Sequence, residues 1–320
     1  MKRIGRNSEF PVGLIGDQQH AKIGTHIGLA QRKTMANGSC LCGTVKFSID
    51  NVSEESSHMS HCHCFMCRKI HGALFATYFN ATGLRFSQGE NAIVSYESSP
   101  GFIRSFCQKC GSPLPEKSTA SDREVEEVYV PAGLMDDDPG VRPQEHIFIE
   151  SKAECYSITD ALPQREHYGD DDLSRVVEVP QNLAKSDAVT GGCLCGAVTF
   201  EYTGTPKMMM NCHCSRCRKV KGAAHATDAF VAGDDLSWTN GEQNITEYAH
   251  AGAKFFGHAF CKTCGSSVPR PRPDGSVYNV PVGSLNQPPG IEAKGHIFIG
   301  SKAPWFEVTD DKPQWDEMPT

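Results

Sequence analysis

Fourteen of the fifteen cysteines in this 320-residue chain fall into two copies of one spacing pattern. Each copy has a C-x-C pair, then a C-x-C-x-x-C cluster, then a C-x-x-C pair. The first copy is Cys40, Cys42, Cys62, Cys64, Cys67, Cys107 and Cys110. The second copy is Cys193, Cys195, Cys212, Cys214, Cys217, Cys261 and Cys264. A closed zinc site takes four thiolates and an open one takes three, so each copy has the cysteines for one structural and one reactive zinc.

Cysteine clusters indicate disulfides in small secreted proteins and metal sites in intracellular ones. Residues 1–34 contain no continuous apolar segment of the kind found in secretory signals. No apolar run approaches the roughly eighteen residues that a membrane span requires. Each half of the chain is long enough to bury its own core without cross-links. We therefore expect metal-bound thiolates in an intracellular, cytoplasmic protein with no membrane segment.

Spacing suggests how the seven cysteines of each copy divide. The C-x-C pair and the distant C-x-x-C pair each offer two ligands, and together they predict a structural four-thiolate zinc site. The predicted ligands are Cys40, Cys42, Cys107 and Cys110 in the first copy, and Cys193, Cys195, Cys261 and Cys264 in the second. Gly111 and Gly265 directly follow the C-x-x-C pairs, where glycine permits a tight turn that points backbone amides at the sulfurs.

The remaining cysteines lie on one short loop in each copy: Cys62, Cys64 and Cys67, and Cys212, Cys214 and Cys217. Three sulfurs can hold a zinc ion and leave its fourth position open, or a further protein ligand can close the site. His63 and His213 lie between two cysteines, so we expect them to be partners of the ligands or surface groups. Three thiolates make zinc a poor activator of water and suit it to holding a thiol as a nucleophilic thiolate.

The repetition extends beyond the cysteines. Four segments recur: GSCLCGTVKF (38–47) as GGCLCGAVTF (191–200), HCHCFMCRKIHGALFAT (61–77) as NCHCSRCRKVKGAAHAT (211–227), FCQKCGSPLP (106–115) as FCKTCGSSVP (260–269), and HIFIESKA (146–153) as HIFIGSKA (296–303). Such a repeat predicts two copies of one domain. We predict an N-terminal extension over 1–34, domains over 35–165 and 188–320, and a linker over 166–187.

Hydrophobic alternation predicts a mainly β fold. CGTVKFSID and CGAVTFEYT alternate apolar and polar residues as half-buried strands do, and long amphipathic helical patterns are absent. One short helical turn is expected after each C-x-C-x-x-C cluster. The net charge of −7 and the pI near 6.0 count against nucleic-acid binding, which requires a basic face.

Some residues outside the cysteine clusters also have side chains suited to binding, hydrogen bonding or packing. Arg68–Lys69 and Arg218–Lys219 adjoin the three-cysteine loops, where they hold a substrate carboxylate, offset the negative charge of the metal site or form a solvated face. His146 and His296 precede the β-prone IFI runs, and we expect them to make structural hydrogen bonds. Cys155 has no cysteine counterpart in the second copy, which predicts a packing role.

The order G-x-C-x-C-G, C-H-C-x-x-C-R-K, F-C-x-x-C-G-S and H-I-F-x-x-S-K-A resembles the glutathione-dependent formaldehyde-activating enzyme family. The centromere protein V group is similar and shares this domain. The resemblance covers residues 38–164 and 191–315. It implies two tandem zinc-bound domains of the all-β "tent" type, each with one structural and one catalytic zinc and so four Zn²⁺ per chain. It also implies carbon–sulfur lyase activity, in which glutathione and formaldehyde interconvert with S-(hydroxymethyl)glutathione.

Two functions remain open on the sequence. The first is a zinc-dependent lyase that acts on adducts of glutathione, or a similar small thiol, with formaldehyde or another small aldehyde. Its catalytic residues would be Cys62, Cys64 and Cys67 in the first copy and Cys212, Cys214 and Cys217 in the second. The alternative is a non-catalytic, zinc-stabilised binding module of the centromere protein V type, in which a fourth protein ligand closes each three-cysteine site. The oligomeric state is left open.

Overall fold

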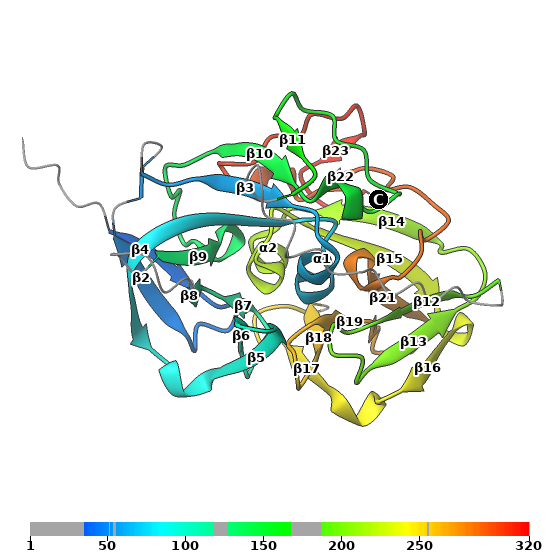
Figure 1. Ribbon diagram of the computed structural model, residues 1–320. Helices are drawn as coiled ribbons and strands as arrows, with labels where there is room; N and C mark the ends of the chain where they lie inside the picture. Colours follow the sequence, from blue (N-terminus) through cyan, green and yellow to red (C-terminus); the bar gives the residue numbers. More distant parts are fainter. Residues whose placement is uncertain are drawn as a thin grey trace, which may run out of the picture. The chain divides into compact units, whose positions relative to one another are not determined.

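The computed structural model of the protein describes residues 35–50, 52–53, 56–117, 127–167, 187–254 and 256–319. The expected N-terminal extension (1–34) and most of the expected linker (168–186) lie outside these residues. We call residues 35–167 the first lobe and residues 187–319 the second lobe. Both belong to one compact unit, Lys33–Thr320 (Figure 1). None of the helices in the described residues is long and apolar enough to cross a membrane.

Short strands make up most of the first lobe. They are β1 (Ala36–Ser39), β2 (Lys46–Asp50), β3 (Met59–Cys62), β4 (Ala76–Gln88), β5 (Ile93–Ser99), β6 (Phe102–Cys107), β7 (Pro113–Leu114), β8 (Glu116–Lys117), β9 (Glu127–Pro131), β10 (Pro143–Ile147) and β11 (Gln164–Arg165). The large sheet has the order β1-β2-β4-β3-β10-β11, and β9 joins it through β4 and carries β8. A second sheet, β5-β6-β7, is a small antiparallel meander. The helical elements are α1 (Phe65–His71), η1 (Glu90–Ala92), η2 (Ala132–Leu134) and η3 (Ile149–Ser151).

The second lobe repeats this plan with one break. Its strands are β12 (Val189–Gly192), β13 (Thr199–Tyr202), β14 (Met208–Cys212), β15 (Ala226–Ala232), β16 (Leu236–Asn240), β17 (Ile245–Ala249), β18 (Gly257–Cys261), β19 (Ser267–Val268), β20 (Arg270–Pro271), β21 (Val277–Pro281), β22 (His296–Ile297) and β23 (Gln314–Trp315). Its helical elements are α2 (Ser215–Lys221), η5 (Gly233–Asp235), η6 (Glu242–Asn244), η7 (Val282–Ser284) and η8 (Ile299–Ser301). Because η5 interrupts the counterpart of β4, the large sheet divides into β20-β21-β15-β14-β22-β23 and β12-β13-β16.

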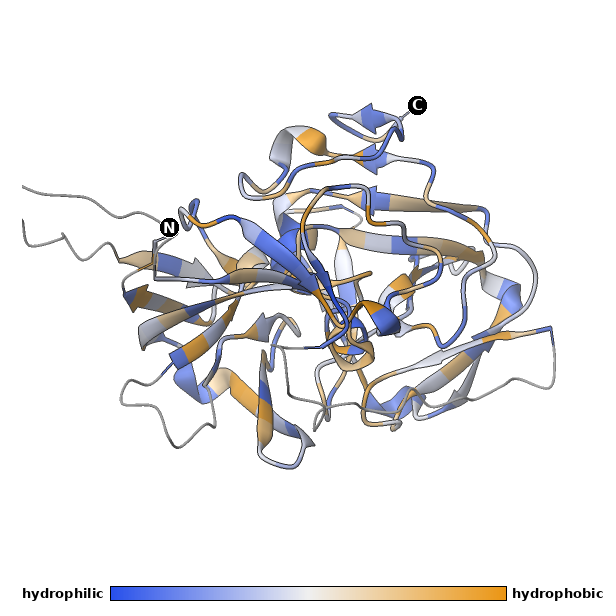
Figure 2. Cartoon of the chain, turned by 45° about the horizontal axis from the view of Figure 1, so that its top comes forward, coloured by the Kyte–Doolittle hydropathy of each residue, from blue (hydrophilic) through white to orange (hydrophobic). Residues whose placement is uncertain are grey.

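Side-chain alternation explains why these segments form strands. Buried and partly exposed residues alternate along β9 and β15, and hydrophobic and hydrophilic residues are interleaved along the strands in Figure 2. A period of two residues places every second side chain on the same face of a sheet. The predicted mainly β fold in two tandem copies is confirmed.

The short helices α1 and α2 begin at a cysteine and end at a glycine. The Sγ atom of Cys64 accepts the backbone N–H of Cys67 at the start of α1, and Gly72 ends the helix in the left-handed conformation with φ of +59°. Cys214 and Gly222 repeat this arrangement around α2. Seven residues are too few for a stable isolated helix. Packing against the rest of the protein must therefore hold both helices.

A lysine from each short helix crosses to the opposite lobe. The ammonium group of Lys69 donates to the carbonyl oxygens of Gly192 and Ser284, at 3.1 and 2.6 Å, and Lys69 is only 3 % exposed. Lys219 reaches the carbonyls of Ser39 and Leu134 in the same way. Lys69 is therefore not part of a solvated face, whereas the side chain of Lys219 is 19 % exposed. They join the two lobes.

Equivalent residues of the lobes also meet each other. The rings of Phe106 and Phe260 lie with their centroids 6.1 Å apart, and the hydroxyls of Thr159 and Thr309 are 2.5 Å apart. Contact between a residue and its own counterpart is the mark of a two-fold arrangement. The two repeats are therefore related to each other like the subunits of a symmetric dimer.

One hydrophobic core runs through both lobes. Phe75 and Phe79 of the first lobe belong to the same buried cluster as Tyr202 and Met209 of the second, and Cys155 packs against it. The structure differs here from the expectation that each half buries a core of its own. The reason is that α1 and α2 insert at the interface, so apolar side chains of each repeat are covered by the other. The predicted packing role of Cys155 is confirmed.

Two glycines allow the closest approach of the lobes. A Cβ atom on Gly133, in η2, would lie 2.5 Å from the nitrogen of Ala223 and from the carbonyl oxygen of Arg218. Gly283, in η7, meets the backbone after α1 at the same short distances. Real Cβ atoms do not approach backbone atoms so closely, so these positions exclude any side chain.

We predict that Gly133→Ala lowers the free energy of unfolding by about 2 kcal/mol or more, because the added methyl group forces the two backbones apart. Denaturant unfolding followed by circular dichroism measures this. Gly300→Ala is the matched control, since its nearest neighbour would be the Asp316 carboxylate at 3.5 Å, an ordinary contact. Equal stability of the two variants would contradict the tight interface.

Candidate metal centres and the adjoining pocket

The C-x-C and C-x-x-C cysteines meet as two groups of four: Cys40, Cys42, Cys107 and Cys110, and Cys193, Cys195, Cys261 and Cys264. All sulfurs of a group lie within 4.8 Å of one another, and the C-x-C sulfurs are 3.4 Å apart in both lobes. Four sulfurs about 2.3 Å from a central zinc ion lie about 3.8 Å apart in a tetrahedron. Every cysteine is a free thiol. The geometry therefore fits a metal ion.

Backbone amides point at these sulfurs. The N–H of Val45 donates to the Sγ atom of Cys40 at 3.3 Å, and Val198 repeats the bond in the second lobe. Gly111 and Gly265 have φ of +72° and +74°, a conformation that costs glycine nothing and strains other residues. The glycine turns expected after the C-x-x-C pairs are present. The N–H groups of Gly111 and Gly265 donate to the carbonyl oxygens of Cys107 and Cys261, so the amide donors to the sulfurs come from Val45 and Val198.

The four-cysteine groups also contact the opposite lobe. The ring of His258 donates from Nδ1 to the carbonyl oxygen of Cys110 at 2.9 Å. A Cβ atom on Gly265 would lie 2.5 Å from the ring of Phe106. Each group therefore supports the interface as well as the lobe that supplies its cysteines.

The other six cysteines of the pattern form two groups of three: Cys62, Cys64 and Cys67, and Cys212, Cys214 and Cys217. Each group gathers where a strand of the large sheet runs into a short helix, β3 into α1 and β14 into α2. Across the described part of the chain, no histidine or carboxylate joins either group as a fourth ligand. Each group therefore offers a cation three sulfurs and leaves one position for another molecule.

His63 and His213 hold these loops from inside the protein. Both are completely buried, so they are not surface groups. Nε2 of His63 lies 2.8 Å from Nδ1 of His146, whose Nε2 lies 3.0 Å from the carboxylate of Asp160. Because Asp160 can only accept, His146 donates to it and in turn accepts from His63. The second lobe repeats this chain with His213, His296 and Asp310.

Charge in the metal-free loops favours a cation. Burial, reinforced by His146, lowers the pKa of His63 to about 2, so this ring stays neutral. Hydrogen bonds from the two partner thiols hold the pKa of Cys64 well below its ordinary value, and they lower the pKa of Cys214 to about 3. In each group the central cysteine is thus the one whose thiolate form is favoured by its neighbours. Soft sulfur ligands with negative charge suit zinc.

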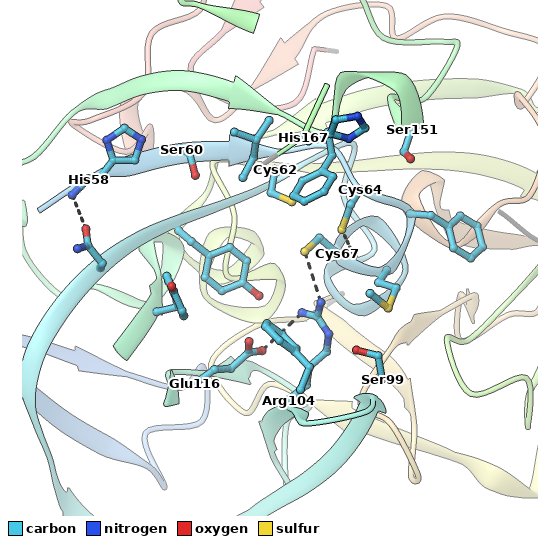
Figure 3. A pocket seen from close by; sticks show the side chains of 18 of the residues that line it. His58, Ser60, Cys62, Cys64, Cys67, Ser99, Arg104, Glu116, Ser151 and His167 are labelled. Atoms are coloured by element: carbon cyan, nitrogen blue, oxygen red, sulfur yellow. Dashed lines mark hydrogen bonds and ion pairs between the residues drawn. The ribbon is translucent and has the colours of Figure 1, made fainter. Parts of the chain in front are cut away.

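A pocket of about 470 Å³ adjoins the three cysteines of the first lobe. Figure 3 shows Cys62, Cys64 and Cys67 on one side of it and Arg104 and Glu116 on the other. The cysteines come from β3 and α1, whereas Arg104 lies on β6 and Glu116 on β8. Both sheets of the lobe therefore contribute to the pocket.

Arg104 and Glu116 form a buried pair in this pocket. Arg104 is 4 % exposed, and its guanidinium lies 3.7 Å from the sulfur of Cys67 and 3.6 Å from Oε1 of Glu116. Its Nε donates to the hydroxyl of Ser98 at 3.1 Å. Oε1 of Glu116 is buried and accepts no hydrogen bond. Burial raises the pKa of Glu116 to about 7, although Arg104 acts in the opposite direction.

Tyr78 also lines the pocket, and its hydrogen bond has a defined direction. The Nδ1 atom of His71 contacts the carbonyl oxygen of Lys221, which can only accept, so Nδ1 carries the proton. Nε2 of His71 must then accept from the Tyr78 hydroxyl, 2.7 Å away. The phenol oxygen of Tyr78 is left as an acceptor toward the pocket.

The corresponding positions of the second lobe carry different charges. Strand register equates Tyr78 with Asp228, since each lies two residues beyond the alanine paired with the last residue of β3 or β14. The pairing registers of the corresponding strands also equate Arg104 with His258 and Glu116 with Arg270. The sulfur groups are alike in the two lobes, but the residues at these three positions differ.

Sequence reasoning missed several of these residues. Arg104, Glu116 and Tyr78 differ between the copies, so a search for repeated motifs passes over them. Asp160 and Asp310 could have been found, because T-D-x-x-P-Q occurs at 159–164 and again at 309–314.

We predict a pH dependence of stability that arises from Glu116. Because its pKa is about 7 in the folded protein and near 4.5 when unfolded, it contributes most below pH 4.5, and that contribution falls as the pH rises toward 7. The loss amounts to about 3 kcal/mol. Glu116→Gln should therefore lose less stability than wild type between pH 4.5 and 7 in urea unfolding. Parallel curves for the two proteins would contradict this assignment.

A comparison with protein-family models finds the same duplication. The family model of the glutathione-dependent formaldehyde-activating enzyme matches residues 35–151 and again residues 188–301. A crystal structure of a Rhodobacter sphaeroides protein is 28 % identical in sequence, with a TM-score of 0.27, and the alignment covers 33 % of this chain and 98 % of that one. Because the two matched segments together span more than half of the chain, the protein belongs to the glutathione-dependent formaldehyde-activating enzyme family.

Proposed function

We propose that the protein is a zinc-dependent enzyme of the carbon–sulfur lyase type, acting on adducts between a small thiol, such as glutathione, and formaldehyde or another small aldehyde. The observation that carries this proposal is the group Cys62, Cys64 and Cys67, which lines a pocket and has no fourth ligand among the described residues. Cys212, Cys214 and Cys217 form the matching group in the second lobe. The two four-cysteine groups would hold structural zinc.

Zinc bound by three cysteines would supply a soft Lewis acid that keeps a substrate sulfur deprotonated at neutral pH. The thiolate sulfur then adds to the carbonyl carbon of the aldehyde. A carbon–sulfur bond forms, the carbonyl π bond breaks, and the oxygen takes up a proton equivalent to the one that the thiol released. The reverse reaction breaks the carbon–sulfur bond and releases the aldehyde.

Residues around the first group have defined parts in this reaction. The guanidinium of Arg104, 3.7 Å from the sulfur of Cys67, offsets negative charge that builds up beside the cysteines. The phenol oxygen of Tyr78 can accept a hydrogen bond from the hydroxyl of the adduct. Phe65, Phe79 and Phe102, which also line the pocket, limit the access of water to the reacting sulfur.

A reducing, intracellular compartment is the setting that this proposal requires. The sulfurs of each C-x-C pair lie 3.4 Å apart, so loss of the metal under oxidising conditions would favour disulfides between them. The binding-module alternative needs each three-cysteine group to be closed by a protein ligand, and the described residues supply none.

Metal analysis tests the assignment of the clusters. We expect four zinc ions per chain, one for each cysteine group. Cys107→Ser should remove one ion and destabilise the protein by about 3 kcal/mol or more, because it breaks a site that joins segments distant in the chain. Cys64→Ser should remove one ion at a smaller cost in stability, because its group lies on one loop. Native mass spectrometry and urea unfolding measure both effects. Four zinc ions in either variant would contradict the assignment.

Activity tests the chemistry. The protein should accelerate the formation of S-(hydroxymethyl)glutathione, or of the adduct of another thiol, above the spontaneous rate followed by NMR. The double variant Cys64→Ala with Cys214→Ala should lose this acceleration. Cys155→Ala is the matched control, because Cys155 belongs to none of the four groups, and it should retain the wild-type rate. No difference between wild type and the double variant with any thiol would refute the proposal.

A further inference from the structure

The pocket of the first lobe has mainly apolar walls. They are formed by Phe65, Met66, Phe79, Phe102, Ile147 and Phe148. Its volume of about 470 Å³ is in the range of small-molecule binding sites. Phe148 has a φ of +58°, a left-handed conformation that costs a non-glycine residue about 1 kcal/mol. Such strain is found where the surrounding structure holds a side chain in place for binding, and here that side chain lines the pocket.

Two oxygens inside the pocket are open to donors from a ligand, Oε1 of ionised Glu116 and the phenol oxygen of Tyr78, and the hydroxyls of Ser60, Ser99 and Ser151 also line it. Oε1 of Glu116 accepts no hydrogen bond, although it is buried. The hydroxyl of Tyr78 has already used its proton on His71. The donors of Arg104 are directed at Ser98, Cys67 and Glu116. A ligand must therefore supply donors of its own if Glu116 and Tyr78 are to be satisfied.

Charge in the pocket disfavours an anion. Glu150 and Glu166 line it, Glu116 inside it is partly ionised near pH 7, and Arg104 is the one lysine or arginine among the described residues that line it. The charge of Arg104 is already shared between Glu116 and the cysteine sulfur. A ligand carboxylate would thus be desolvated in an apolar cavity without a cation to itself, which is costly.

The second lobe provides an internal comparison. Its counterparts of Phe65 and Met66, at the start of the helix, are Ser215 and Arg216, and Arg270 stands in place of Glu116. Three positions that are apolar or acidic in the first lobe are thus polar or basic in the second, whereas Asp228 stands there in place of Tyr78 and His258 in place of Arg104. These substitutions change residues that surround the three cysteines and leave the cysteines themselves unchanged. They are the changes expected when two copies of one site handle molecules of different charge.

We propose that the pocket of the first lobe takes a thiol, or the aldehyde adduct of a thiol, that has an apolar body and a hydroxyl or amine donor but no carboxylate. This inference rests on the proposed function, because it assumes that Cys62, Cys64 and Cys67 receive the sulfur. The apolar body packs against the aromatic walls, and the donor meets Glu116 or Tyr78. Glutathione, which carries two carboxylates, should therefore bind to this pocket more weakly than a thiol of this kind.

Binding of two matched thiols tests the inference. One is mercaptoethanol with a phenyl substituent, and the other is mercaptopropionic acid with the same substituent. Both are titrated by calorimetry into the full zinc-loaded chain carrying Cys214→Ala, which disables the second three-cysteine group. The alcohol should bind about tenfold more tightly than the acid, the ratio expected when one carboxylate is left without a partner.

Two substitutions sharpen the test. Met66→Arg introduces the residue found at position 216 and should bring the ratio of dissociation constants close to one or invert it. Met318→Arg is the charge-matched control, because Met318 is exposed and does not line the pocket, and it should leave the ratio unchanged. Adduct formation with formaldehyde is followed in the same samples.

The outcomes separate this inference from the proposed function. Tighter binding of the alcohol without any acceleration of adduct formation would support the selectivity and refute the lyase activity. Acceleration with glutathione as efficient as with the alcohol would refute the selectivity and leave the lyase activity standing. Equal binding of the two thiols, tighter binding of the acid, or binding of neither would also overturn the inference.

Discussion

The structure depends on the convergence of cysteine sulfurs from segments that are far apart in the chain. Cys42 and Cys107 are separated by 65 residues, yet their sulfurs lie 3.8 Å apart, and Cys195 and Cys261 repeat this contact at 3.7 Å. Short strands such as β7 and β19, with two residues each, contribute little stability by themselves. The sulfur groups fix where the hairpins lie, and the hairpin of β5 and β6 in turn carries Arg104 to the sulfur of Cys67.

The lobes complete each other around this framework. Lys69 and Lys219 place their ammonium groups on carbonyl oxygens of the opposite repeat, where they satisfy acceptors that would otherwise be buried without a donor. The glycines at 133 and 283 let the backbones of η2 and η7 reach α2 and α1. Stability and the geometry of the sites are consequently properties of the pair of repeats.

The sequence predicted the parts of the structure that follow local rules. Cysteine spacing and hydrophobic alternation recur in both copies, and they were enough to predict the mainly β fold and its duplication. The fate of Lys69 could not be predicted, because a charged residue on a helix normally faces water and only the packing of the second repeat changes that. Glu116 could not be predicted either, because burial of a carboxylate in an apolar pocket leaves no periodic signal and the second copy has Arg270 there.

The contact between Thr159 and Thr309 has a wider consequence. In a homodimer, every substitution appears twice, so a change that suits one active centre is imposed on its twin. Joining the partners in a single polypeptide removes that restriction while keeping the original docking surface. One site can then change its substrate while the other keeps its original one, and both sites keep the shared fold.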